Sequence, residues 1–214
     1  TRVGSDGKVS LTNVSAGTLQ LIADVSGYYR SGAATAAGAF ASLSPVGVLD
    51  TRTGVGAPKA AVLAGASVSL LVDGAGRVPV TGVSAVALNV TAAAPTRAGF
   101  VTVYASGAVR PTASNLNFTA GRTTSNMVVV RVGTGGRVVL YNGSPGTVAL
   151  SADVHREYIA GAPTGASTYA ARAPARLLGT PTRLGLGVVL FPNPQFALVV
   201  HVTSQALGVH HPPA

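Results

Sequence analysis

The chain of 214 residues is apolar and basic: 47% of its residues are hydrophobic, 10% are charged, and the formal net charge is +9. This composition is too apolar for a disordered chain, and the absence of cysteine excludes disulfides and thiolate metal sites. No run of 18 apolar residues occurs, so the sequence predicts no transmembrane helix. The 27 glycines and 13 prolines indicate many short strands joined by tight turns.

The chain contains an imperfect tandem repeat with a period of 129 residues. Compared with itself at that shift, the sequence shows identical residues in one register without a gap. The coinciding pairs are Arg2 and Arg131, Val3 and Val132, Gly4 and Gly133, Gly7 and Gly136, Val9 and Val138, Leu11 and Leu140, Asn13 and Asn142, Gly17 and Gly146, Thr18 and Thr147, Leu21 and Leu150, Ala23 and Ala152, Asp24 and Asp153, Val25 and Val154, Tyr29 and Tyr158, Pro45 and Pro174, Leu49 and Leu178, and Thr51 and Thr180.

This register predicts five segments. Residues 1–30 match the closing part of a repeat, residues 43–158 form a complete repeat, and residues 172–214 are the diverged opening of a further repeat with a tail. Residues 31–42 and 159–171 between them are rich in glycine, alanine, serine and threonine, a composition typical of flexible linkers.

Within the complete repeat, apolar and polar residues alternate with a period of two, which is typical of half-buried strands. The predicted strands, in chain order, are residues 68–72, 83–91, 100–104, 114–119, 127–132, 137–141 and 147–154. Seven strands with this spacing predict an all-β fold, either an antiparallel β-sandwich or a closed barrel. The predicted core consists of Val86, Leu88, Val90, Val101, Val103, Leu116, Phe118, Val128, Val130, Val138, Leu140, Leu150, Ala152 and Val154.

Four strings of the sequence resemble a known module. They are Leu-Asp-Thr-Arg-Thr-Gly at 49–54, Ala-Leu-Asn-Val-Thr at 87–91, Pro-Thr-Ala-Ser-Asn-Leu-Asn-Phe at 111–118 and Ala-Asp-Val-Ser-Gly-Tyr-Tyr at 23–29. Together they resemble a tandem β-repeat module of secreted actinobacterial surface proteins. The resemblance implies a secreted protein, extracellular or associated with the cell wall, with a structural or adhesive role. It implies no catalytic, cofactor-binding or metal-binding residues.

The few carboxylates point to structure rather than catalysis. Asp24 and Asp153 are equivalent positions of the repeat, and a carboxylate that recurs in each copy is expected to hold backbone amides or an arginine. Asp50 and Arg52 are expected to form a salt bridge or turn-locking hydrogen bonds, and both are replaced together in the third copy. We therefore predict that the chain is not an enzyme and uses no cofactor or metal.

Arginine supplies 13 of the 15 cationic residues, and no two arginines are adjacent. This dispersal predicts a general surface charge and no nucleic-acid partner. Five tyrosines are the candidate ligand-binding residues, because sugar rings stack on aromatic side chains: Tyr28, Tyr29, Tyr104, Tyr141 and Tyr158. Tryptophan is absent, which favours a structural role for these rings. Asn142 is interpreted as a polar side chain of a strand rather than a glycosylation site.

Two hypotheses of function follow. The first is a non-catalytic structural or assembly module of the cell surface. Its partner is a second copy of itself, reached head-to-tail when residues 172–214 of one chain complete residues 1–30 of the next; the alternative is that these two segments pair within one chain. The second hypothesis is a binding module for cell-wall glycan or an anionic polymer, which would use the tyrosines and arginines.

Overall fold

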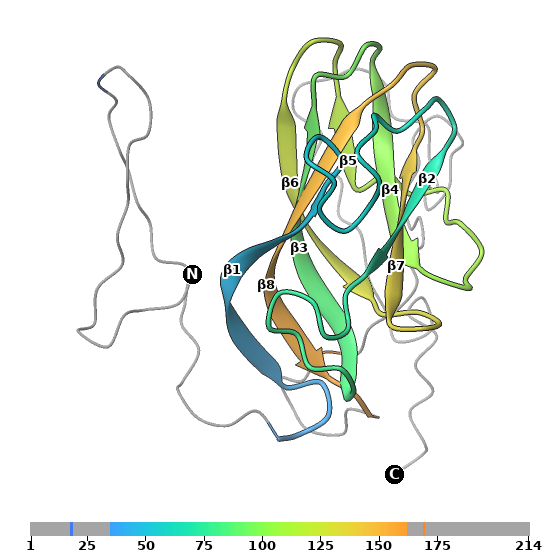
Figure 1. Cartoon of the computed structure of the whole chain (residues 1–214). Coiled ribbons are helices and arrows are strands. Elements are labelled where there is room, and N and C mark those ends of the chain that lie inside the picture. Colours follow the sequence, from blue (N-terminus) through green and yellow to red (C-terminus); the bar gives the residue numbers. More distant parts are fainter. Residues whose placement is uncertain (1–17, 19–34, 162–168, 170–214) are drawn as a thin grey trace, which may run out of the picture. The chain divides into compact units, whose positions relative to one another are not determined.

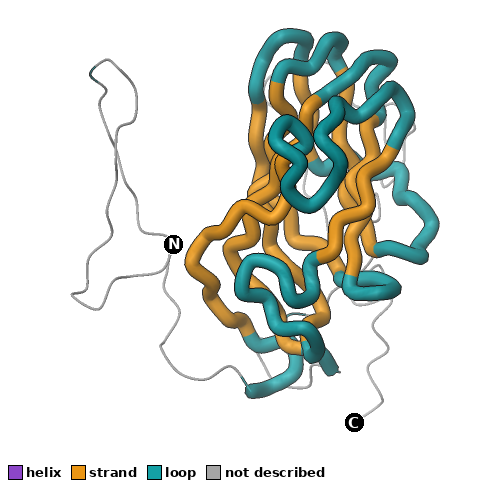
Figure 2. Tube along the Cα trace, in the orientation of Figure 1, coloured by secondary structure: helices purple, strands orange, loops and turns teal. Residues whose placement is uncertain are grey.

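The computed structural model describes Thr18, residues 35–161 and Tyr169, and over these residues the protein is all-β. Two four-stranded antiparallel sheets pack face to face as a sandwich, without a helix (Figures 1 and 2). The strands are β1 (Phe40–Asp50), β2 (Ser67–Leu71), β3 (Val83–Ala93), β4 (Gly99–Ala105), β5 (Leu116–Phe118), β6 (Thr124–Arg131), β7 (Arg137–Asn142) and β8 (Ala149–Ile159). The sequence left a sandwich and a closed barrel open, and the sandwich is the fold observed.

The strand order is β1-β8-β3-β6 in the first sheet and β2-β7-β4-β5 in the second. Strands β7 and β8 are therefore inner strands, each with a hydrogen-bonded neighbour on both sides. No helix in the described part of the chain is long and apolar enough to span a membrane.

The core lies between the two sheets and follows from the period of two. In β8, Leu150, Ala152 and Val154 are fully buried, and they alternate with the partly exposed Ser151 and Asp153. Every one of the fourteen residues predicted for the core is buried. Because each large aliphatic side chain contributes about 1.5–3 kcal/mol on burial, this core can stabilise the sandwich without disulfides.

Strand β1 is the element that the sequence did not predict. Its first residues, from Phe40 to Ser42, fall in the segment predicted as a linker, so the linker prediction for 31–42 was wrong at these residues. The alternation is hidden because Pro45 and Gly47 interrupt it. The register with β8 shifts near both residues, between Ser42 and Val46 and between Gly47 and Leu49. An edge strand tolerates proline because one side of its backbone has no hydrogen-bonding neighbour.

The two ends of the described domain lie at the same end of the sandwich. Phe40, which begins β1, pairs with Tyr158 near the end of β8 (Figure 1). The pairing extends outward, because Gly38 donates its N–H to the Ile159 carbonyl oxygen at 2.9 Å and Ile159 donates to Ala39 at 3.0 Å. The chain therefore enters and leaves the sandwich side by side.

Candidate functional site

Asp50 and Arg52 form an ion pair in the turn that follows β1. The Arg52 Nη2 and Nε atoms lie 2.8 and 3.0 Å from the two carboxylate oxygens of Asp50, and the Arg52 backbone N–H donates to the same carboxylate at 2.9 Å. These hydrogen bonds hold the pKa of Asp50 below its usual range. Thr51 between them is buried, and its hydroxyl accepts the Leu150 N–H at 3.0 Å. The ion pair thus orders a turn whose middle residue, Thr51, is hydrogen-bonded to β8.

Asn142, the last residue of β7, is the centre of a buried hydrogen-bond network. Its amide nitrogen lies 3.1, 2.9 and 2.8 Å from the carbonyl oxygens of Val62, Leu63 and Gly146. Its side-chain oxygen accepts from the Ser144 N–H at 3.0 Å and from the Ser144 hydroxyl at 2.7 Å. Asn142 is fully buried, so the interpretation as a simple strand polar residue missed its role. Asn142 thereby binds the loop that contains Val62 and Leu63, and the loop that contains Gly146, to the end of β7.

A signal for this network was present in the repeat. Asn142, Ser144 and Gly146 are matched at the shift of 129 by Asn13, Ser15 and Gly17. The whole set of side chains that form the network therefore recurs together, although the sequence alone does not show which backbone groups it binds.

The repeat preserves the inner face of β7 and changes its outer face. Val138, Leu140 and Asn142 are fully buried and are identical to Val9, Leu11 and Asn13. The outward residues between them differ between the copies: Arg137, Val139 and Tyr141 are matched by Lys8, Ser10 and Thr12. In β8 the fully buried Leu150, Ala152 and Val154 are likewise identical to their equivalents, Leu21, Ala23 and Val25.

Asp153 lies on the outer face of β8, opposite Gly47 of β1 and Asn89 of β3. A Cβ placed on Gly47 would lie 3.4 Å from the Asp153 carboxylate, which is an ordinary van der Waals contact. Among the described residues no hydrogen bond or ion pair reaches this carboxylate, so its stabilising role stays a prediction. The equivalent Asp24 lies outside the described residues.

The candidate tyrosines do not form one surface. Tyr104 and Tyr141 lie on the outer face of the second sheet, Tyr158 belongs to the first sheet, and Tyr28 and Tyr29 lie outside the described residues. Five rings were predicted as possible ligand-binding residues, and the structure brings two of them to one face.

The outer face of the second sheet combines aromatic rings with a cation. The rings of Phe100 and Tyr141 are 6.3 Å apart, and the Arg110 guanidinium lies 3.7 Å from the centre of the Tyr141 ring. The loop between β4 and β5 covers the same face, because Thr102 is buried and donates its hydroxyl to the Ala113 carbonyl oxygen at 3.0 Å. Arg110 therefore occupies one side of the ring on which a sugar would stack.

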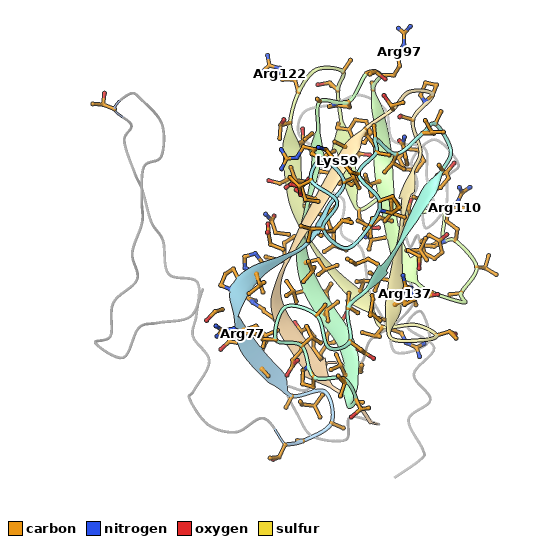
Figure 3. All side chains as sticks on the ribbon, viewed as in Figure 1. Lys59, Arg77, Arg97, Arg110, Arg122 and Arg137 are labelled. Carbon is orange, nitrogen blue, oxygen red and sulfur yellow. The ribbon has the colours of Figure 1, made fainter. Side chains whose placement is uncertain are left out.

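The cationic side chains of the sandwich are dispersed. Figure 3 shows Arg97 and Arg122 at one end of the sandwich, Arg110 and Arg137 along the second sheet, and Arg77 elsewhere. Arg137 is held against β2, where its Nε donates to the Ser69 hydroxyl at 2.9 Å. Within the described part of the chain, no group of three or more histidine, cysteine, aspartate or glutamate side chains could hold a metal ion.

A shallow groove of about 380 Å³ runs along the loop that precedes β2. Its walls are mostly small and apolar, including Pro58, Ala61 and Val68, with Arg137 at its side. The groove offers apolar surface and one cation, and sequence reasoning did not identify it.

Two carboxyl groups each have one buried oxygen without a hydrogen-bond partner. They are Oδ1 of Asp73, which follows β2, and Oε2 of Glu157 in β8. Burial raises the pKa of both groups. In the repeat register Glu157 takes the position of Tyr28, so this carboxyl stands where the other copy has an aromatic ring.

The fold and these surfaces define an antiparallel β-sandwich domain within a tandem repeat. A scan against models of protein families finds no match to the chain, and a comparison with curated proteins also finds none. The likeness to secreted actinobacterial repeat modules therefore remains a prediction. The proposed pairing of residues 1–30 with residues 172–214 lies outside the described residues and also remains one.

Proposed function

We propose that this chain is a non-catalytic structural module of a secreted cell-surface protein, in which β-sandwich repeats follow one another along the chain. The observation that carries the proposal is the division within β7: inner residues are identical between the copies and outer residues differ. A shared ligand site would require shared outward side chains. A shared scaffold requires a shared core, which is the pattern found in β7; in β8 the core residues are shared and so is the outward Asp153.

The path of the chain through the sandwich supports the same role. Because β1 and β8 are antiparallel neighbours, the linkers before and after the domain start from one end of it. In a chain of such domains, each domain is attached to both of its linkers at one end and its other end projects away from them. This arrangement suits a surface layer built from adjacent copies. Its partner is another copy of the same repeat.

Binding of an anionic wall polymer is the second candidate, favoured by Arg110 and Tyr141 on the second sheet. Sedimentation of the full chain with purified wall glycan and with poly(glycerol phosphate), over a range of salt concentrations, separates the two functions. The informative variants are Tyr141→Thr, which installs the residue of the first copy, and Arg110→Ala. Arg97→Ala is the matched control, because it removes an equal charge from a different loop.

For a structural module we expect weak, salt-sensitive sedimentation that Tyr141→Thr leaves unchanged and that the two arginine variants lower equally. Saturable, salt-resistant binding that is lost in Tyr141→Thr and Arg110→Ala but kept in Arg97→Ala would replace the structural proposal with the binding one.

A further inference from the structure

Asn142 is followed by Gly143, and this is the one Asn-Gly pair in the sequence. In a flexible chain, an asparagine before glycine is especially prone to lose its side-chain amide. Glycine has no side chain to hinder the backbone nitrogen that attacks the asparagine, and it adopts the conformations that the attack requires. The residue at the centre of the buried network is therefore also the most labile amide of the chain.

The packing of Phe100 in β4 explains why a glycine stands here. A Cβ added to Gly143 would overlap the ring atoms of Phe100, so a larger residue would displace this ring. The Gly143 N–H also donates to the Phe100 carbonyl oxygen at 2.8 Å. The first copy of the repeat has Val14 at the equivalent position, so the labile pair belongs to the second copy.

In the folded domain both reacting groups are held. Asn142 is fully buried, its amide nitrogen lies within 3.1 Å of three carbonyl oxygens, and its side-chain oxygen accepts two hydrogen bonds from Ser144. The attacking atom is the Gly143 nitrogen, which is hydrogen-bonded to β4. Attack requires this nitrogen to leave the Phe100 carbonyl oxygen and to lose its proton to solvent. The folded state therefore opposes the reaction.

We propose that Asn142 is a deamidation site that folding closes, and that the reaction is irreversible once the domain has opened. The Gly143 nitrogen loses its proton and bonds to the side-chain carbonyl carbon of Asn142. The bond from that carbon to the side-chain nitrogen breaks, ammonia leaves with the added proton, and a succinimide ring remains. Water then hydrolyses the ring and leaves aspartate or isoaspartate at this position.

The product does not fit the network. The amide of Asn142 donates to the carbonyl oxygens of Val62, Leu63 and Gly146, whereas a carboxylate has no hydrogen to donate. A negative charge would face these oxygens in a buried site, where an unpaired charge is costly. A domain that stays open long enough to react is therefore unable to close again stably. The reaction consumes only water, so it goes beyond the proposed structural function and does not depend on it.

The test measures deamidation of Asn142 in the full chain, incubated folded and in guanidinium chloride at mildly alkaline pH. Trypsin releases residues 138–156, whose only asparagine is Asn142, so mass spectrometry of this peptide detects the conversion of amide to carboxyl. We expect deamidation to be at least about tenfold slower in the folded chain, which reacts only through its opened fraction. Asn117, which precedes Phe118, is the internal control and should react far more slowly than Asn142 in denaturant.

Two variants separate the chemistry of the pair from its protection. Gly143→Val installs the residue of the first copy and should slow the reaction in denaturant at least about tenfold, because its branched side chain hinders the attack. This comparison is made in unfolded chains, so the variant need not fold. Ser144→Ala loses its hydroxyl bonds to Asn142 and Gly146, and should raise the folded-state rate roughly five- to thirtyfold relative to its own rate in denaturant. Asn117→Ala is the matched control and should leave that ratio unchanged.

Dilution of the partly reacted chains out of denaturant tests irreversibility. Limited proteolysis should digest the molecules that carry a carboxyl group at position 142 and spare those that keep the amide. Equal deamidation in folded and denatured chains would overturn the closed site. A faster reaction in the folded chain would overturn it as well, because the Ser144 donors would then activate the Asn142 carbonyl. Equal protease resistance of deamidated and unreacted molecules would overturn the irreversibility.

Discussion

Two turns of this sandwich are held by polar side chains, one at the surface and one in the interior. After β1, Asp50 and Arg52 bind each other at the surface, where the Arg52 side chain is 57% exposed and the Asp50 side chain is 20% exposed. After β7, Asn142 and Ser144 bind each other and three backbone carbonyls in the buried interior. The third copy of the repeat replaces Asp50 and Arg52 with Gly179 and Pro181, whereas the first copy keeps both members of the buried pair.

The difference shows which polar contacts the fold depends on. Surface ion pairs contribute little, because water competes for both charges. A buried amide that loses its partner leaves donors and acceptors unsatisfied, at a cost of roughly 1–3 kcal/mol for each group. Burial, rather than formal charge, therefore determines which turn can be changed without loss of the fold.

Asn142→Ala should have the largest effect of the changes considered. It removes the amide donor from the carbonyls of Val62, Leu63 and Gly146 and leaves Gly146 only the Ser144 hydroxyl, so we expect a loss of roughly 2–4 kcal/mol in the free energy of unfolding. Urea denaturation followed by circular dichroism measures it. Asn117→Ala on the exposed side of β5 is the control and should stay within about 0.5 kcal/mol of wild type. Equal losses in the two variants would contradict the comparison.

Ser144→Ala tests the second side chain of the buried network, and its expected effect on stability is intermediate. The variant loses the hydroxyl bonds to Asn142 and to the Gly146 carbonyl oxygen, at 2.7 and 3.0 Å, but keeps its backbone N–H donated to Asn142. We expect the free energy of unfolding to fall by about 1–2 kcal/mol, less than for Asn142→Ala. A double-mutant cycle with Asn142→Ala should show strong coupling, and additive losses would mean that the two side chains act independently.

Glu157→Gln tests a buried group that is not satisfied. Because burial raises the pKa of Glu157, the folded protein binds its proton more tightly than the unfolded chain does. Stability then falls as pH rises from the ordinary glutamate pKa through the raised one. We expect Glu157→Gln to melt at a higher temperature than wild type at neutral pH and at a similar temperature at pH 3. A lower melting temperature at neutral pH would show that the carboxylate is stabilised when charged.

Asp50→Asn should have the smallest effect. The pKa of Asp50 is lowered in the folded state, so its contribution is present above the ordinary aspartate pKa and is lost as pH falls through the lowered value. Melting curves at pH 7 should show a slight loss that disappears in high salt and shrinks as the pH falls toward the lowered pKa of Asp50. A loss at pH 7 as large as that of Asn142→Ala would show that the surface pair, and not burial, holds the fold.

The sequence predicted the parts of this domain that obey a simple period. Strand β7 alternates throughout, β8 alternates from Ala149 to Val154, and every predicted core residue is buried. Strand β1 was missed because Pro45 and Gly47 break the alternation, and its pairing with β8 compensates through shifts in register.

The Asn142 network was missed for a different reason. It joins side chains to backbone groups as far as 80 positions away, and a local pattern does not encode such a distance. The contact between Tyr158 and Tyr169 is of the same kind, since a local pattern does not show that a residue beyond β8 lies against this strand. The repeat register is the sequence signal that links both to their counterparts.

The antiparallel pairing of β1 with β8 has a mechanical consequence. Tension applied through the two linkers pulls on Phe40 and Tyr158, which face each other at one end of the strand pair. The load then falls along the inter-strand hydrogen bonds and on one pair at a time, so β1 peels from β8 progressively. Aromatic contacts at that end lie where peeling begins. The tensile strength of an array of such domains would therefore depend first on the contacts at this end of β1 and β8, and only then on the cores of the domains.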